Sequence, residues 1–338
     1  MLDPHTPAVL LAPMEGVTDA PMRHLLAAEG GFTFAVAEFA RVSYTPLPAH
    51  VLRRLVPELD TAGRTPTGLP VLVQLLGGDP GRLAESAATA VRAGAPGIDL
   101  NFGCPARTVN RHDGGAVLLK SPDRVFAIVR AVRAAVPSHL PVSAKLRLGW
   151  DDPRAILDTA PAAADGGAAW LTVHARTRAQ GYAPPADWPL VGRAREVVRV
   201  PVVANGDIHT LDAFRRCREQ TGCRHFMLGR GAVADPALAR RVAAELGLPT
   251  PPPPPPGPVD WAARVRQLLA LVAPPFRPDG ELRRVKQWLR MAAGCGTFGR
   301  FDAIKRATDL GELLDLVDRT EANLPPHACS PRPVLAEG

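Results

Sequence analysis

The chain has 338 residues, of which 46% are hydrophobic and 22% charged, as in an ordinary globular protein with one large and one small domain. No apolar run reaches the roughly 18 residues of a membrane span, and residues 1–7 carry no secretory signal, so we expect a cytoplasmic protein without a membrane partner. The five cysteines include no C-x-x-C pair, which argues against a disulfide framework and a metal site. The formal net charge of +7 permits a polyanionic partner without identifying one.

Apolar, strand-like runs alternate with helical stretches as far as residue 247, a pattern typical of parallel α/β folds. The expected strands are 9–14, 34–39, 71–76, 97–101, 142–148, 170–175, 202–206 and 225–229. Helices are expected between them, among others over 82–93, 123–136, 154–165, 211–221 and 236–246. Eight such strands predict a (β/α)8 TIM barrel. The competing doubly wound sheet would need a Gly-rich dinucleotide turn after its first strand, and residues 12–19 contain no G-x-G-x-x-G.

A run rich in proline from 248 to 258 interrupts this alternation. Such a run forms neither helix nor sheet, so we expect a polyproline II linker that ends a barrel domain of residues 1–247. Helical periodicity over 259–273, 281–292 and 303–319 predicts a small helical bundle domain at 259–324. We expect residues 325–338 to form a disordered tail.

Polar residues gather at the carboxyl ends of the expected strands, where barrels of this kind build their active sites. In strand order they are Pro13, Met14 and Glu15; Gln74; Asn101 and Cys104; Lys145 and Arg147; His174 and Arg176; Asn205, Gly206 and Asp207; and Gly229, Arg230 and Gly231. The glycine turns after the last two strands predict a phosphate site made of backbone N–H groups and Arg230. We therefore expect a phosphorylated ligand.

Cys104 follows the strand-like run 97–101 and stands close to Gly103 and Pro105. These neighbours keep the position out of a strand ladder or a helix, so the sequence favours a thiol displayed at the barrel mouth. The alternative is a buried structural cysteine, which is the commoner environment of this residue type.

Lys145 and His174 leave two chemistries open. A neutral lysine amine can form a Schiff base, as in an aldolase, whereas a charged lysine stabilises an anionic cofactor or intermediate. His174 could equally be a histidine of the core. Cys104 favours the second chemistry, because adding hydrogen across a polarised double bond requires a hydride source and a separate proton donor.

Several of these motifs together resemble the tRNA-dihydrouridine synthase family. They are the segments 13–19, 101–105 with 114–119, 145–150, 174–177, 205–207 and 229–231. Further segments are similar to the bacterial C-type subfamily, which reduces uridine 16 in the D-loop of tRNA; they are 38–41, 57–58 with 64–68, 73–77 and 286–289. The resemblance runs through nearly the whole barrel.

The resemblance implies an oxidoreductase that reduces uridine to 5,6-dihydrouridine with FMN as cofactor and NADPH as reductant. Hydride would pass from FMN N5 to uracil C6, and Cys104 would protonate C5, a role that an unperturbed thiol pKa of about 8.5 permits at neutral pH. Lys145 is expected to stay charged beside the flavin. The family's pattern assigns Pro13, Met14 and Glu15 to the border of the flavin ring, Gln74, Lys145 and His174 to contacts with it, Asn205, Gly206, Asp207, Gly229 and Arg230 to its phosphate, and Asn101 to the substrate base.

The expected helical domain is basic enough to hold RNA. Between residues 280 and 306 seven basic side chains accompany two acidic ones, which predicts a phosphate footprint for tRNA beside a barrel that acts on RNA. We expect a monomer. The expected tRNA contacts are Arg41, Tyr182, Arg284, Lys286 and Arg306.

The sequence leaves two other functions open. A flavin enzyme of the dihydroorotate dehydrogenase type, acting on a free pyrimidine, would share the barrel but lack the basic helical domain. A protein that only binds tRNA would purify colourless and would lose nothing on Cys104→Ala.

Overall fold

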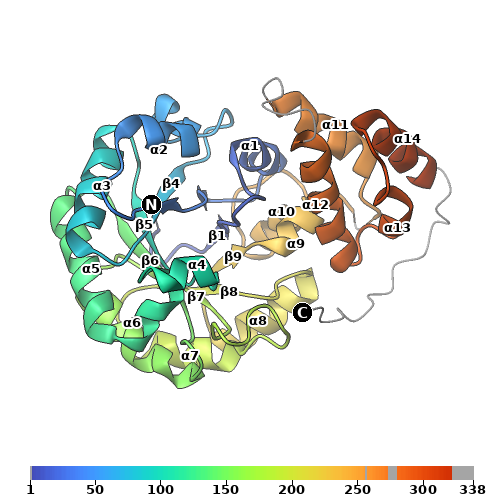
Figure 1. Cartoon of the computed structure of the whole chain (residues 1–338). Coiled ribbons are helices and arrows are strands. Elements are labelled where there is room, and N and C mark those ends of the chain that lie inside the picture. The colour runs from blue at the N-terminus through green and yellow to red at the C-terminus, as the bar shows by residue number, and fades with distance from the viewer. Residues whose placement is uncertain (1, 256, 273–279, 322–338) are drawn as a thin grey trace.

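The structure is a computed structural model that describes residues 2–255, 257–272 and 280–321. Its centre is a closed barrel of parallel strands (Figure 1). The sheet order is β2-β1-β9-β8-β7-β6-β5-β4-β3, and β2 also pairs with β4, which closes the ring. The (β/α)8 expectation is therefore confirmed, with the two-residue β3 lying beside β4. The strands are β1 (Ala8–Leu11), β2 (Phe34–Val36), β3 (Ala40–Arg41), β4 (Val71–Leu76), β5 (Ile98–Phe102), β6 (Val142–Arg147), β7 (Leu171–His174), β8 (Val202–Asn205) and β9 (His225–Leu228).

One expected strand is interrupted. The sequence predicts a single strand over 34–39, but β2 ends at Val36 and pairing with β4 resumes only at Ala40. Within the interruption Glu38 Oε1 accepts the Val17 backbone N–H at 3.0 Å. The chain therefore leaves the ladder where it stabilises the loop after β1. The other expected strands agree with the structure to within a few residues at each end.

The longer of helices α1 to α10 surround the barrel (Figure 1). Several begin after an aspartate or threonine whose side chain accepts the N–H of the third helical residue, an N-cap that stabilises the helix start. These caps are Asp19, Asp79, Asp187 and Thr210. The helices are α1 (Ala20–Glu29), α2 (Ala49–Leu55), α3 (Pro80–Arg92), α4 (Arg107–Arg111), α5 (Pro122–Ala135), α6 (Ile156–Asp165), α7 (Trp188–Glu196), α8 (Leu211–Thr221), α9 (Arg230–Ala234) and α10 (Leu238–Glu245).

Alternating strand residues point into the barrel and divide its interior into two layers. The layer nearer the amino ends of the strands is apolar and includes Leu10, Phe34, Val36, Leu72, Trp170 and Val203. The next inward positions along the strands are polar and include Gln74, Asp99, Asn101, Ser143, Lys145, Thr172, His174 and Asn205. The apolar layer supports the barrel, and the polar layer lies where the βα-loops begin.

The C-terminal helices are α11 (Trp261–Leu271), α12 (Gly280–Gly294), α13 (Phe301–Ile304) and α14 (Leu310–Glu321), called the helical unit below. They lie against the side of the barrel formed by α1 and α9 (Figure 1). Trp288 of α12 is buried, stacks edge-on against Trp261 at 5.4 Å and donates its indole N–H to the Val233 carbonyl at 2.8 Å. The helical unit thus shares a core with the barrel.

The expected single helix over 303–319 is wrong, because the structure divides it into α13 and α14. Asp309 accepts the Glu312 backbone N–H at 2.8 Å, and Glu312 accepts the Thr308 backbone N–H at 2.7 Å. This reciprocal pair is close to a capping box and starts a new helix at Leu310. The D-x-x-E spacing of Asp309 and Glu312 could have indicated this helix start from the sequence.

The described residues of the expected linker 248–258 form no helix or strand. The expected tail 325–338 lies outside the described residues. Within the described ranges, none of the helices combines the length and the apolar character needed to cross a membrane.

Candidate active site

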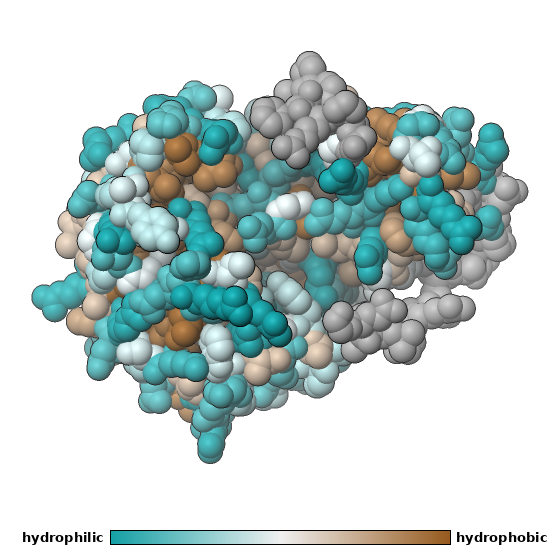
Figure 2. Space-filling view, in the orientation of Figure 1, coloured by the Kyte–Doolittle hydropathy of each residue, from teal (hydrophilic) through white to brown (hydrophobic). Residues whose placement is uncertain are grey.

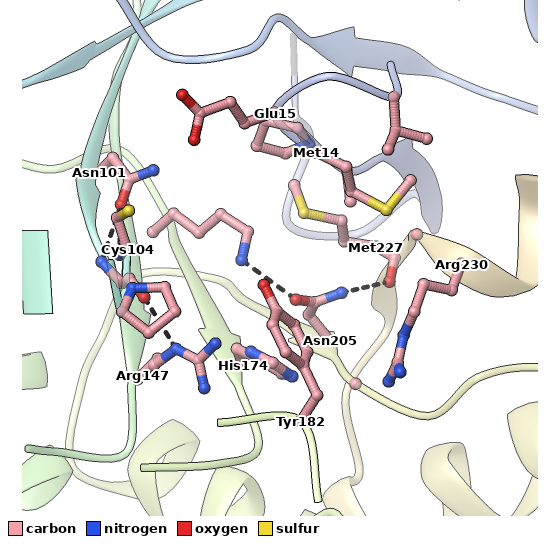
Figure 3. A pocket seen from close by; sticks show the side chains of 18 of the residues that line it. Met14, Glu15, Asn101, Cys104, Arg147, His174, Tyr182, Asn205, Met227 and Arg230 are labelled. Atoms are coloured by element: carbon pink, nitrogen blue, oxygen red, sulfur yellow. Dashed lines mark hydrogen bonds between the residues drawn. The ribbon is translucent and has the colours of Figure 1, made fainter. Parts of the chain in front are cut away.

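A cavity of about 590 Å³ opens at the carboxyl ends of the strands, and Figure 2 shows this face of the molecule hollowed near its centre. Met291 of α12 also lines the cavity, so the helical unit closes one side. Asn101, Cys104 and Arg147 lie on one wall, and Asn205 and Arg230 lie opposite (Figure 3). The expected site residues that line it are Pro13, Met14, Glu15, Asn101, Cys104, Lys145, His174, Tyr182, Asn205, Gly206, Asp207, Gly229 and Arg230.

Gln74, an expected flavin contact, is not among the residues that line the cavity. Its side chain is fully buried in the polar layer of the barrel. It donates from Nε2 to Asp99 Oδ2 at 2.7 Å and accepts from Asn101 Nδ2 at 2.9 Å. Gln74 therefore supports Asn101, a residue of the cavity wall, and its expected contact with a flavin stays a prediction.

Cys104 lines the cavity but is only 8% exposed, so the expectation of a freely displayed thiol needs correction. One side of the residue packs against Leu76 and Val109. Burial raises the pKa of the thiol, and the nearby Glu15 carboxylate acts in the same direction. The sulfur at neutral pH is therefore a protonated thiol, which is the form a proton donor requires.

The loop that carries Cys104 is held by Asn101. Its Oδ1 accepts the backbone N–H groups of Gly103 and Cys104, both at 2.9 Å. Gly115 lies beneath the loop at a φ of +69°, and a Cβ there would approach the Cys104 carbonyl oxygen to 2.9 Å. Only glycine fits that position without strain.

Lys145 lines the cavity and donates from Nζ to Asn205 Oδ1 at 3.1 Å. Burial lowers its pKa to about 8, and the Arg147 charge adds to the lowering, whereas Asp99 opposes it. The amine is therefore mostly charged at pH 7. This agrees with the expectation of a lysine cation.

His174 is buried on the cavity wall, and burial together with the charges of Arg147 and Lys145 holds its pKa well below the usual value. The ring is therefore neutral at pH 7. Arg176 Nη1 lies 3.4 Å from His174 Nε2, and arginine can only donate, so Nε2 accepts and Nδ1 carries the proton.

Asp207 pairs with several cationic side chains at the other end of the cavity. It forms ion pairs with Arg176, with Arg230 at 3.2 Å and with His209 at 3.4 Å. Burial opposes ionisation of Asp207, but hydrogen bonds from His209 and Arg176 outweigh it and keep its pKa well below the usual value. The carboxylate orients three cationic side chains and is itself saturated with donors.

His209 is a cavity residue that the sequence reasoning missed. Burial alone would lower its pKa, but hydrogen bonds to Asp207 and to Cys295, the residue after α12, outweigh it and raise the pKa to about 9. The imidazole is therefore charged at neutral pH. The sequence could have indicated His209, because it stands two residues after Asp207 in the turn that follows β8.

Tyr182 stands at the cavity mouth and is 57% exposed. The guanidinium groups of Arg147 and Arg230 each lie 5.3 Å from its ring centre, a cation–π arrangement that orients the ring. Arg147 also donates to the carbonyls of Gly103 at 2.8 Å and Gly181 at 2.8 Å. It thereby connects the Cys104 loop to the Tyr182 loop.

The remaining expected tRNA contacts do not line the cavity. Arg284 pairs with Asp19, the N-cap of α1, and Lys286 donates to the carbonyls of Lys305 and Ala307 beside α13. Arg41 donates to the Thr108 carbonyl at 3.2 Å, whereas Arg306 is exposed on the helical unit. No cluster of side chains that could hold a metal ion occurs in the described part of the chain.

Fold and site together define a barrel whose cavity is bordered by a protonated thiol on one side and by a group of cations on the other. The sequence model of one family, Dihydrouridine synthase (Dus), matches residues 10–292. The chain therefore belongs to the dihydrouridine synthase family.

Several curated relatives carry the name tRNA-dihydrouridine(16) synthase. The protein from Pseudomonas putida is 49% identical over 290 residues, which are 84% of this chain and 87% of the relative. The protein from Ralstonia nicotianae is 44% identical over 94% of this chain and 97% of its own length. That from Neisseria meningitidis serogroup B is 42% identical over 92% of this chain and 95% of its own length.

Proposed function

We propose that this protein reduces uridine to 5,6-dihydrouridine in tRNA, at position 16 of the D-loop, with FMN as cofactor and NADPH as reductant. Membership of the dihydrouridine synthase family supports the reaction, and the names of the relatives support the substrate and the position. The observation that carries the chemistry is Cys104, a protonated thiol in the wall of a ligand-sized cavity. A tRNA substrate also accords with a cytoplasmic location.

The donors of the cavity suit a flavin mononucleotide. Its phosphate would be held by Arg230, by the charged His209 and by backbone N–H groups of the glycine turns after β8 and β9. Glycine suits position 229, because a Cβ there would lie only 3.3 Å from Met14 Sδ. Lys145 would stabilise negative charge on the flavin ring, with His174 as a second donor. When bound, FMN supplies the hydride for uracil C6, and NADPH restores it.

Cys104 completes the reduction by donating its proton to uracil C5. Burial keeps that proton on sulfur until negative charge develops on the base. The resulting thiolate regains a proton from solvent through the open cavity. Asn101 keeps the Cys104 backbone in place during the transfer.

The two enzymatic alternatives receive less support. A Schiff-base aldolase needs a neutral lysine, whereas Lys145 is mostly charged at pH 7 and donates to Asn205. An enzyme for a free pyrimidine does not need the helical unit, yet α12 contributes Met291 to the cavity wall. Exposed cations such as Arg306 suit an extended polyanion.

The test is to map dihydrouridine in tRNA from a strain that lacks the gene. We expect dihydrouridine to be missing at position 16, to return with the wild-type gene and to stay missing with Cys104→Ala. Loss at another position would contradict the assigned position, and unchanged tRNA would contradict the function. The purified protein should contain FMN and should not reduce free uridine or orotate.

A further inference from the structure

A buried carboxylate lies beneath the cavity and has no part in the proposed reaction. Asp99 of β5 is only 1% exposed. Its Oδ2 accepts from Gln74 Nε2 at 2.7 Å, and its Oδ1 accepts from the Ser143 hydroxyl at 2.6 Å. Burial raises the pKa of Asp99, while these two donors and the nearby Lys145 charge oppose the rise. Such a group is costly to bury unless it is fully hydrogen-bonded.

From Asp99 a chain of hydrogen bonds runs upward to the thiol loop. Gln74 Oε1 accepts from Asn101 Nδ2 at 2.9 Å. Asn101 Oδ1 then accepts the N–H groups of Gly103 and Cys104, both at 2.9 Å. Three hydrogen bonds in series thus connect the Asp99 carboxyl group to the Cys104 backbone, and a fourth holds Gly103.

The way each amide in this chain of hydrogen bonds is turned depends on Asp99, where the chain begins. The two ends of an amide have nearly the same shape but opposite hydrogen-bonding character. Asp99 Oδ2 accepts in the structure, so Gln74 turns its NH2 group towards Asp99 and its oxygen towards Asn101. Asn101 then presents its oxygen to the loop. In the reversed direction its NH2 group would face two N–H donors, and the loop would lose both bonds.

We propose that Asp99 is a positioning residue that sets the orientation of the Gln74 and Asn101 amides and so holds the Cys104 backbone at the cavity wall. Its consequence for catalysis rests on the proposed function. The geometric part concerns only the loop and does not depend on any substrate.

Ser143 makes the proposal testable, because a hydroxyl can donate or accept. In Asp99→Asn the new amide can turn its oxygen to Gln74 and its NH2 group to the Ser143 hydroxyl, which preserves the direction of the chain. In Ser143→Ala the carboxylate still accepts from Gln74. With both substitutions together, the amide introduced at position 99 has no partner at position 143 and can present either of its ends to Gln74, so position 99 no longer sets the direction of the chain.

The experiment measures amide hydrogen exchange at Gly103 and Cys104 in the full chain without tRNA. We expect each single variant to remain within about twofold of the wild type, and the double variant to exchange at least about tenfold faster. Thr172→Val is the matched control, since Thr172 is a buried barrel residue whose hydroxyl has no partner in the described structure. Exchange in the control should be unchanged. Wild-type protection in the double variant would overturn the proposal, as would additive effects of the single changes.

Gln74→Met provides a second measurement should the double variant fail to fold. Methionine keeps the volume of the side chain but removes both links, so exchange at Gly103 and Cys104 should again rise about tenfold. Protection equal to wild type would contradict the proposal. In turnover assays the double variant should lose about tenfold in kcat with an unchanged KM for tRNA and unchanged FMN content. If no variant, wild type included, forms dihydrouridine, the proposed function fails while the exchange data still decide the role of Asp99.

Discussion

The barrel mouth and the helical unit are both rich in cations but use them differently. At the mouth Arg147 and Arg176 are buried, and Lys145 is enclosed within the barrel. In the helical unit Arg290 and Arg306 are exposed. Burial alters the pKa and fixes the geometry of a charge, whereas an exposed cation stays hydrated and acts through attraction that salt weakens. Changes at the mouth should therefore affect chemistry, and changes on the helical unit should affect affinity.

The largest effect is expected at the mouth. Cys104→Ala removes the proton donor, so dihydrouridine formation should fall about 10²–10⁴-fold while FMN and tRNA still bind. Mass spectrometry of tRNA after a single turnover measures this loss. Cys104→Ser keeps the size of the side chain but is a far weaker acid, and it should show a loss of the same order. Wild-type yield in either variant would contradict the role of the thiol.

The next largest effect is expected on stability, at the contact between the barrel and the helical unit. Trp288→Ala should lower the free energy of unfolding by about 3–5 kcal/mol, because it removes a buried indole shared by the barrel and the helical unit. Trp288→Phe retains most of the packing and loses the bond to the Val233 carbonyl, so we expect a loss of only about 1 kcal/mol. Denaturant titration measures both. Equal losses in the two variants would show that packing is not the main contribution.

A dependence on pH should distinguish the buried lysine from the exposed cations. The pKa of Lys145 is lowered to about 8, so the amine is charged below that pH and neutral above it. Affinity for FMN should then fall by up to about tenfold per pH unit above 8. Fluorescence titration of FMN into the cofactor-free protein at a series of pH values measures this. Lys145→Met should bind FMN weakly with no such dependence, and a sloping profile in that variant would assign the titration elsewhere.

The smallest effect is expected on the helical unit. Arg306→Ala should weaken tRNA binding by a few fold and reduce the salt dependence by about one counterion, with kcat unchanged. Binding measured over a range of salt concentrations tests this. Arg224→Ala is the control, because Arg224 is exposed just before β9, at the end of the barrel opposite the cavity. Equal weakening in both variants would indicate that only total charge matters.

Much of the site could be predicted from strand ends. Asn101, Cys104, Lys145, His174 and Asn205 stand where apolar runs finish, and all of them line one cavity. The prediction succeeded because parallel strands of a barrel bring their carboxyl ends to one face. It does not reach as far as Gln74, which occupies the same kind of position but is fully buried and bonded to Asp99 and Asn101, since a single sequence does not show which of these side chains pair with one another.

The helical unit was harder to predict in detail. Arg284 and Lys286 belong to a basic stretch that suggests RNA contacts, yet Arg284 pairs with Asp19 and Lys286 binds two carbonyls beside α13. A count of charges cannot tell a cation that binds its own protein from one that faces solvent. The partner Asp19 is far from Arg284 in the sequence, and only the packing of α12 near α1 brings the two together.

The sequence by itself determined the barrel and the residue types at the strand ends, because these follow from periodicity and local turn chemistry. Only the tertiary structure decided which of those side chains line the cavity and which support another side chain. Burial and the choice of hydrogen-bond partner are properties of surroundings assembled from distant segments. The protonated Cys104, the charged His209 and the buried Asp99 all owe their states to such neighbours.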